Sequence, residues 1–337
     1  MSALKLAKIG VFFLGITVLS SCFKEDEPVP PYVSPEGVVS NQVKLGKYYT
    51  KFAYYSLKNN QFLNIADCNS WDLAFNCFAD RYELVVNSHK SMRVGHTSKA
   101  FSEISNIQDV DYWNTEKSGD SYKDSTAFGI WWDGAGNTLD SAYVIDLGKD
   151  LSTGNSFGYK KIKLGSFSAG KYHFTIANLN GSEERNIEIE KNSQYNLVHY
   201  SIAKNEQVTV EPLKSEWDLF FGQYMTILFD GTAPMDYSVN GVLINAANGV
   251  KVAVEKEKSL DEIKVSDLNS YTYYDFQDVI GHTWKKVGGI TGPVVYSVVP
   301  WVYIIKDTSG DYYKLRFTSF NDELGEKGSP AFEVGKF

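Results

Sequence analysis

Apolar and polar positions alternate along most of the chain, and long stretches of helical periodicity are almost absent. In SWDLAF (70–75) and EWDLFF (216–221), the Trp, the Leu and the last Phe occupy every second position. Successive side chains of a strand point to opposite faces, so this spacing predicts strands with one buried face. The 22 Tyr and 20 Phe residues and the frequent Val, Ile and Thr also favour strands. The chain is therefore predicted to be an all-β protein of antiparallel sheets.

Several further segments occur twice in the same order. Upstream of each WD strand, Tyr55-Ser56 and Asn60 correspond to Tyr200-Ser201 and Asn205. Further matches lie downstream: Met92 with Met235, FGIWW (128–132) with IGHTW (280–284), SAYVIDLG (141–148) with WVYIIKDT (301–308), and YKKIKLGSF (159–167) with YYKLRFTSF (312–320). So many ordered matches indicate duplication of a whole domain. Two tandem β domains, residues 45–182 and 183–337, are predicted, each with its own core.

The first 21 residues have the pattern of a secretory signal peptide. Lys5 and Lys8 precede an apolar run that ends at Leu19, and Leu19-Ser20-Ser21-Cys22 has the order that a bacterial lipoprotein signal peptidase cleaves. The alternative is a short membrane helix, but the run is well below the roughly 20 residues that span a bilayer. Residues 1–21 are therefore predicted to be removed and Cys22 to carry the lipid.

Residues 22–44 are predicted to form a tether, because three consecutive acidic residues and then four prolines cannot build a packed element. An acidic run close behind the lipidated cysteine is similar to the export signal of Bacteroidetes lipoproteins. This predicts a lipid-anchored protein on the outer face of the outer membrane. The alternative is a merely solvated linker.

Charge and motifs narrow the function classes. The net charge of −8 argues against a nucleic-acid partner. No serine elbow, phosphate loop or His-Glu zinc motif occurs, so an enzyme is not expected.

Cys68 and Cys77 flank the first WD strand, a geometry that is hard to bridge, and two free thiols are predicted. His173 and His199 are predicted to lie on the surface.

The tyrosine-serine strand, the WD strand and the stretch VYIIKDTSGDYYKLRFTSFNDELGEKGSPAFEV resemble the HmuY family of haem-binding surface lipoproteins of Bacteroidetes. The resemblance covers residues from about 185 to 337 well and residues from about 45 to 180 more weakly. It implies an all-β protein that clamps one haem and passes it to a TonB-dependent outer-membrane receptor. The membrane is contacted through the lipid anchor only.

The resemblance also implies two axial haem ligands, His or Met, from loops. Gly289 stands near the position where a haem-binding relative carries its second axial His, so this chain departs from the family pattern there. His282, which occurs in one copy only, and Met235, in a Gly-Pro loop, are the predicted ligands. For His282 the alternative is a partly exposed strand residue, and for Met235 it is a packing role shared with Met92. His89 and His96 are a second candidate pair.

The leading hypothesis is a surface lipoprotein that captures haem, with haem or a haem protein as its partner. A non-haem accessory lipoprotein that docks on a transporter, and a glycan-binding surface module that uses exposed aromatic rings, are the alternatives.

Overall fold

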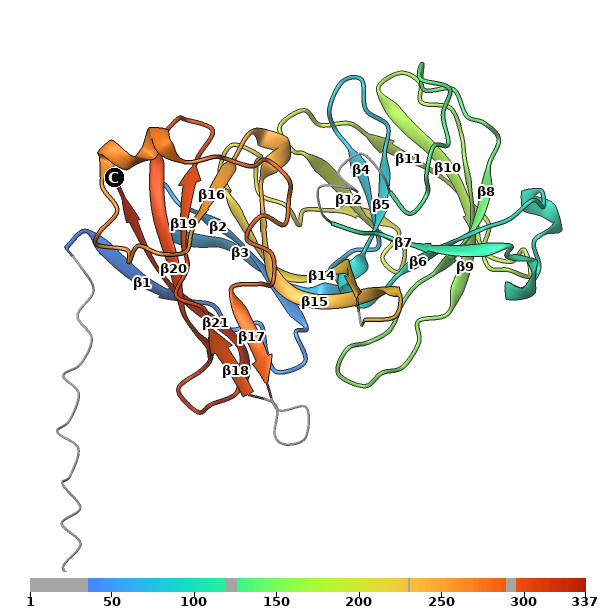
Figure 1. The fold of residues 1–337 in the computed structure, drawn as a ribbon. Helices are drawn as coiled ribbons and strands as arrows, with labels where there is room; N and C mark the ends of the chain where they lie inside the picture. Colours follow the sequence, from blue (N-terminus) through green and yellow to red (C-terminus); the bar gives the residue numbers. More distant parts are fainter. Residues whose placement is uncertain (1–35, 119–125, 230, 289–294) are drawn as a thin grey trace, which may run out of the picture. The chain divides into compact units, whose positions relative to one another are not determined.

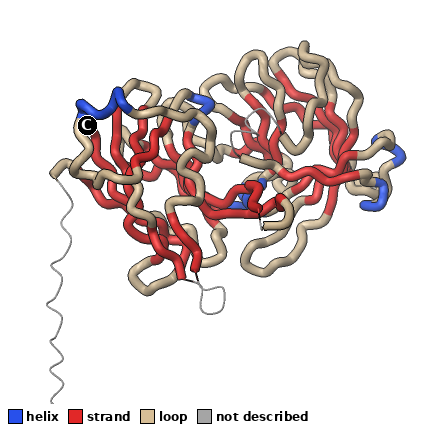
Figure 2. Tube along the Cα trace, viewed as in Figure 1, coloured by secondary structure: helices blue, strands red, loops and turns tan. Residues whose placement is uncertain are grey.

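The computed structural model describes residues 36–118, 126–229, 231–288 and 295–337. The predicted signal peptide, Cys22, most of the tether and Gly289 lie outside this range. The described chain is all-β, as predicted, and its helices are short 3-10 turns (Figure 2). These turns are η1 (Cys68–Ser70), η2 (Ser88–Lys90), η3 (Phe101–Glu103), η4 (Ile107–Asp109), η6 (Ala246–Asn248) and η7 (Val265–Ser270). None of the described helices has the length and apolar character needed to cross a membrane.

The strands form two groups, each with its own sheets and core (Figure 1). The central lobe, residues 68–210, holds a four-stranded sheet of order β13-β12-β4-β5 and a six-stranded sheet of order β11-β10-β9-β8-β6-β7. Its strands are β4 (Leu73–Asn76), β5 (Leu84–Val86), β6 (Arg93–His96), β7 (Tyr112–Thr115), β8 (Ala142–Asp146), β9 (Tyr159–Leu164), β10 (Lys171–Ala177), β11 (Arg185–Glu190), β12 (Leu197–Ser201) and β13 (Glu206–Val208). A buried cluster that includes Phe75, Trp131 and Tyr172 fills it.

The terminal lobe, residues 38–67 with 219–337, contains sheets of order β1-β21-β20-β19-β16, β15-β14-β2-β3 and β17-β18. Its strands are β1 (Val38–Gln42), β2 (Lys51–Ser56), β3 (Gln61–Asp67), β14 (Leu219–Phe229), β15 (Pro234–Ile244), β16 (Lys251–Glu255), β17 (Lys285–Gly288), β18 (Val295–Val298), β19 (Val302–Lys306), β20 (Tyr312–Asn321) and β21 (Lys327–Lys336). Its core joins Tyr55 and Phe332 with Trp284. In chain order, the central lobe is thus inserted between β3 and β14.

Each WD strand pairs with the hairpin that belongs to the other repeat. β14, which follows the second WD, is antiparallel to β2, whereas β4, which follows the first WD, is antiparallel to β12 (Figure 1). The aspartates of the two WD motifs, Asp72 and Asp218, each stabilise one of these strand pairs through an equivalent hydrogen bond. Asp218 Oδ2 accepts a hydrogen bond from the Leu57 main-chain N–H at 2.7 Å, and Asp72 Oδ2 accepts one from Ile202 N–H at 2.6 Å. The hydrogen bonds therefore join each hairpin to the WD strand of the other predicted repeat, which is called the hairpin exchange below.

Other local contacts repeat as well. The Tyr55 and Tyr200 hydroxyls donate to Asn60 and Asn205, at 2.5 and 2.6 Å, and both asparagines have the left-handed backbone that Asn tolerates at a turn. After each WD strand an asparagine, Asn87 or Asn245, donates from Nδ2 to the carbonyl oxygen of the nearby Trp, at 2.9 Å in both. Residue types that recur along the chain thus make equivalent contacts at these positions.

The predicted boundary at 182/183 lies between β10 and β11, which pair with each other. The division into residues 45–182 and 183–337 was based on the repeat in the sequence, whereas the sheets and the cores are divided between the two lobes. The division of the chain into two tandem domains stays a prediction.

Two predictions about buried positions have different outcomes. Cys68 and Cys77 are free, as expected, and both are buried. The prediction of one buried face is wrong for β4, because all four of its residues are buried. On the second face, Asp72, just before the strand, forms an ion pair with the buried Lys90, and Asn76 lines a cavity between the lobes.

Candidate ligand-binding site

His282 lies in the turn that leads into β17, directly after Gly281, which forms a bridge with Val242 of β15. The side chain is half-buried, and the Tyr224 hydroxyl lies 3.4 Å from Nδ1. Burial and the nearby Lys285 lower the pKa of the imidazole. His282 is therefore neutral at pH 7, the form in which an imidazole nitrogen binds a metal. Within the described chain, no hydrogen bond occupies its Nε2.

Met235 lies near the start of β15, opposite Leu228, and its side chain is 45% exposed. Met92, its match in the sequence, is fully buried, so the two methionines do not share a packing role. Asn87 and Asn245 make the same contacts in the two repeats. When the repeats are aligned on these two residues, the position equivalent to Met92 is Val250. The thioether of Met235 is consequently available to a ligand.

The structure does not bring His282 and Met235 together. His282 is next to the residue bridged to Val242, seven positions further along β15 than Met235. A strand rises about 3.4 Å per residue, so about 24 Å of strand separates Met235 from Val242. The pair stays a prediction, and joint ligation of one iron requires the hairpin end to move.

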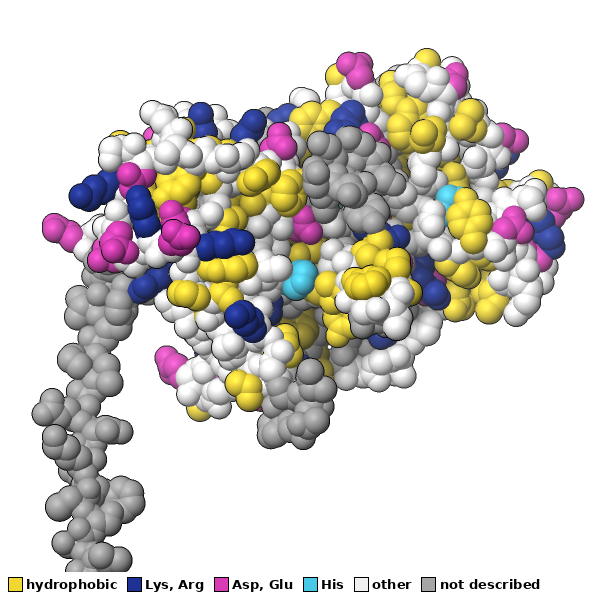
Figure 3. Space-filling model, viewed as in Figure 1, with side chains coloured by type: hydrophobic (Ala, Val, Ile, Leu, Met, Phe, Trp, Pro, Cys, Tyr) yellow, Lys and Arg dark blue, Asp and Glu magenta, His cyan; other side chains and the backbone are white. Residues whose placement is uncertain are grey.

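Exposed apolar side chains gather on the two hairpins nearest these residues. Phe229, Met235 and Tyr237 are exposed at the end of the β14–β15 hairpin, and Val287 and Val295 on the β17–β18 hairpin that follows His282. Figure 3 shows hydrophobic side chains grouped over the end of the β14–β15 hairpin. Grouped exposed apolar residues are typical of a binding surface for an apolar ligand or partner.

His89 and His96 do not form a shared site. His89 is 3% exposed, Tyr49 O lies 2.7 Å from its Nε2, and its Nδ1 accepts the Gln223 main-chain N–H at 3.2 Å. Burial lowers the pKa of His89 to about 4, and neither ring nitrogen is free. His96 instead stacks on Tyr112, with ring centroids 4.6 Å apart, in a separate pocket of about 600 Å³. Across the described ranges, no group of three or more His, Cys, Asp or Glu side chains could hold a metal ion.

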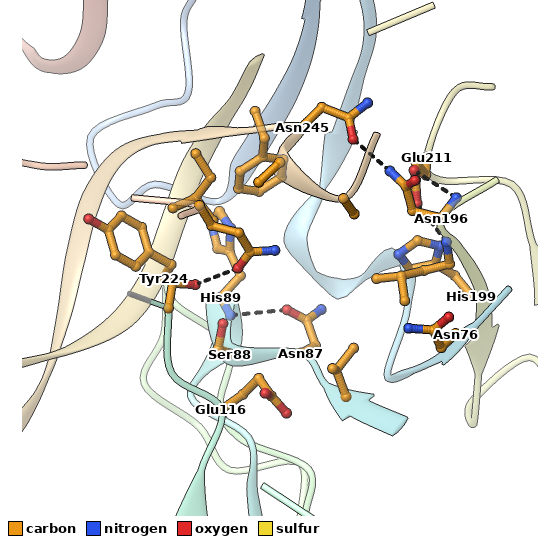
Figure 4. Close-up of a pocket in the computed structure, with 18 of the residues that line it drawn as sticks. Asn76, Asn87, Ser88, His89, Glu116, Asn196, His199, Glu211, Tyr224 and Asn245 are labelled. Atoms are coloured by element: carbon orange, nitrogen blue, oxygen red, sulfur yellow. Dashed lines mark hydrogen bonds between the residues drawn. The ribbon is translucent and has the colours of Figure 1, made fainter. Parts of the chain in front are cut away.

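A cavity of about 260 Å³, the interlobe cavity, lies between the lobes (Figure 4). Its aromatic wall comes from both: Phe52, Tyr54, Phe220 and Trp217 belong to β2, β14 and the residues before β14, and Trp71 and Phe78 flank β4. Its polar lining includes Asn76, Glu83, Asn87, His89, Glu116, Asn196, His199, Glu211 and Gln223. The hairpin exchange therefore brings residues distant in sequence around one space.

Burial perturbs several ionisable groups in this cavity. It raises the pKa of Glu116 to about 8 and that of Glu211 to about 7. Glu211 accepts N–H donors from Trp217 and from the main chain of Asn196 and Leu197, and these bonds oppose the rise. Both pKa values thus lie closer to neutral pH than that of an ordinary glutamate.

The prediction that His199 lies on the surface is wrong. It is 4% exposed and packs edge-to-face on Trp71, with ring centroids 4.7 Å apart, and burial lowers its pKa to about 3. Strand parity alone could not reveal this, because the covering residues come from the other repeat. One signal was available: His199 matches the buried aromatic Tyr54 when Tyr55 is aligned with Tyr200. His173 is partly exposed, in line with its prediction.

Comparison with known proteins gives one family over most of the chain. The model of the family described as HmuY protein matches residues 48–334. No curated protein matches the sequence. Solved structures that are similar include apo PinO of Porphyromonas gingivitis, at 10% identity over 89% of this chain and 97% of the other, with a TM-score of 0.28. An apo HmuY analogue of Tannerella forsythia has 10% identity, coverages of 89% and 95%, and a TM-score of 0.28. A proposed HmuY-like haem-binding protein of Bacteroides vulgatus has 14% identity, coverages of 52% and 90%, and a TM-score of 0.20.

Proposed function

The chain belongs to the HmuY family, and from this premise we propose that it is a surface-anchored lipoprotein that captures haem and presents it to a TonB-dependent outer-membrane receptor. The observation that carries the proposal is the family match, which spans both lobes. The sequence adds the lipoprotein signal that ends at Cys22. The role is binding, and the haem iron is cargo.

In this proposal His282 is one axial ligand and Met235 the other. His282 is suited to this role because its imidazole is neutral and half-buried and its Nε2 makes no hydrogen bond with the described residues. Met235 supplies a thioether on an exposed apolar hairpin end. The β14–β15 hairpin would have to close towards His282 as haem binds. The apolar residues of the two hairpins would then cover the porphyrin faces.

Titration with haemin tests the ligand pair. Wild-type protein is expected to give a sharp Soret band, and His282→Ala and Met235→Ala are each expected to weaken binding at least tenfold, because each removes one iron ligand. His173→Ala, on the partly exposed strand β10, is the matched control and should bind like wild type. If both ligand variants bind like wild type, the assignment is wrong.

A second candidate is an accessory lipoprotein that keeps the fold and does not bind haem. Two observations favour it: Gly289 stands where a haem-binding relative carries an axial His, and about 24 Å of strand separates Met235 from Val242, beside which His282 lies. Absence of any spectral change when haemin is added to the wild type would support this role and contradict haem capture.

Replacing Cys22 with Ser tests the anchor. Because the thioether-linked lipid is the only membrane contact proposed, Cys22→Ser should move the protein from the membrane fraction to the soluble fraction without changing its unfolding transition. Immunoblotting of fractions after a high-salt wash measures this. A variant that stays in the washed membrane would show that another contact holds it there.

A further inference from the structure

The pocket that contains His96 and Tyr112, called the strand-end pocket below, lies where four neighbouring strands of the six-stranded sheet begin or end. It has a volume of about 600 Å³. Its lining includes His96 at the end of β6, Tyr112 at the start of β7, Ala142 at the start of β8 and Lys163 near the end of β9. Ligand pockets usually have volumes of about 300–1,000 Å³, so this space is large enough for a small molecule.

The Tyr112 side chain provides an open aromatic surface in this pocket. It is 56% exposed, and its ring stacks on His96 with an angle of 8° between the rings. His96 is held in place, because its Nε2 lies 2.9 Å from Ala127 O and 3.1 Å from Asn114 Nδ2. Since His96 covers one face of the tyrosine ring, the exposed area belongs to the other face and the ring edge. A flat apolar surface can stack on that face.

The charged groups of the pocket are paired with one another. Lys163 lies 2.7 Å from Asp140, and Lys99 pairs with Asp109. The side chains of Asp140 and Lys163 are 75% and 42% exposed, so a ligand can reach both of them. A hydroxyl group both donates and accepts hydrogen bonds, and it can therefore bind to the carboxylate and to the ammonium group without breaking their pairing. This arrangement favours a neutral ligand that is rich in hydroxyl groups.

The spacing of the strands indicates the length of such a ligand. Tyr112 is opposite His96, and His96 is opposite Tyr143, so two strand spacings separate the main chains of β7 and β8. Lys163 is opposite Ala142, one strand further along the sheet. Because neighbouring strands lie about 4.8 Å apart, the main chains that carry Tyr112 and the ion pair are about 10 Å or more apart. A ligand that contacts both must be elongated.

We propose that the strand-end pocket binds a neutral β-linked oligosaccharide of at least two sugar rings. The apolar C–H face of one ring stacks on Tyr112, and hydroxyl groups of another ring form hydrogen bonds with Asp140 and Lys163. β-Linked glucose units suit this arrangement, because all their ring substituents are equatorial and both ring faces present C–H groups. This site is separate from the proposed haem ligands and does not depend on haem capture.

Calorimetric titration of the full chain with cellotetraose tests the proposal, with glucose and maltotetraose as comparisons. Cellotetraose is expected to bind at least tenfold more tightly than glucose, because a single ring cannot contact Tyr112 and the ion pair together. Maltotetraose has the same composition but α-linkages, which curve the chain away from one flat face. It is expected to bind at least tenfold more weakly than cellotetraose.

Substitutions at the two ends of the pocket test the contacts separately. Tyr112→Ala removes the stacking surface and should weaken cellotetraose binding at least tenfold, whereas Tyr112→Phe keeps the ring and should bind like wild type. Tyr48→Ala is the matched control, because Tyr48 is 50% exposed and lies outside the pocket. Lys163→Met should lower the affinity for cellotetraose and leave that for glucose unchanged. It provides a second variant if Tyr112→Ala does not show a cooperative unfolding transition.

Four results would overturn the proposal. The first is the absence of cellotetraose binding at millimolar concentration, and the second is equal affinity for cellotetraose and glucose. The third is an unchanged affinity for cellotetraose in folded Tyr112→Ala or Lys163→Met. The fourth is equal binding of maltotetraose, which would contradict the assignment to β-linked chains.

Discussion

Residues 185–337, expressed alone, are expected to be insoluble or to unfold without a cooperative transition, whereas residues 68–210 are expected to fold. The first fragment covers the second repeat but lacks β2, the partner of β14. It also lacks β4, the partner of β12, and the core residues Ala53 and Tyr55. The sequence repeat alone predicts the opposite result, because it treats the second copy as a complete domain.

Residues 68–210 retain the whole central lobe. Both of its sheets are complete, and every residue of its main buried cluster lies between Leu73 and Ile202. Urea unfolding followed by tryptophan fluorescence distinguishes the two fragments, because a complete core unfolds in one steep transition. Residues 36–67 joined to 211–337 by a Gly-Ser linker should restore folding of the terminal lobe. A cooperative transition in 185–337 would show that the exchanged hairpins are dispensable.

Substituting the two equivalent aspartates is expected to give very different losses of stability. Asp72 pairs with the buried Lys90, so Asp72→Asn leaves a buried charge without a partner and should cost about 3–5 kcal/mol of unfolding free energy. Asp218 accepts the same kind of main-chain hydrogen bond. The residue equivalent to Lys90, which lies three positions after Asn87, is the neutral Asn248, which lies three positions after Asn245. Asp218→Asn keeps an acceptor for Leu57 and should therefore cost less than about 1 kcal/mol.

The stability difference between wild type and Asp218→Asn is expected to change with pH in a definite direction. Burial raises its pKa from 3.8 to about 6, with a further contribution from Asp307. The folded state thus binds the proton more tightly than the unfolded state, so the stabilisation is complete below about pH 4 and is lost as the pH rises through 6. Relative to wild type, Asp218→Asn should become more stable between pH 5 and pH 8. Urea titrations at both pH values measure this, and a difference that runs the other way would contradict the assignment.

The alternation of residues was sufficient to predict the strands but not their partners. The two WD strands have similar sequences, with Leu73 and Leu219 each followed by an aromatic residue. Each of them could therefore pair with either tyrosine-serine hairpin. The choice depends on which pairing allows both cores to close, which is a property of the whole chain. For the same reason the free cysteines were predictable from local geometry, whereas the burial of His89 and His199 was not.

The candidate site shows the same limit. His282 and Met235 could be selected because each is a ligand-type residue in a turn or loop, but sequence alignment gave no distance between them. The interlobe cavity had no sequence signature, since Glu83, Glu116, Asn196 and Gln223 come from four separate segments. The pairing of β4 with β12 and of β2 with β14 places residues of both lobes around this cavity.

The two buried thiols allow two different openings of the protein to be measured separately by alkylation. Cys68 packs with Phe52 and Trp217 where the lobes meet, and burial raises its thiol pKa to about 12. Cys77 lies in the core of the central lobe, where burial also raises its pKa. Alkylation requires an accessible thiolate, so the intact protein is protected at both positions. The modification rate of Cys68 therefore reports how often the lobes separate, and that of Cys77 reports how often the central lobe itself unfolds.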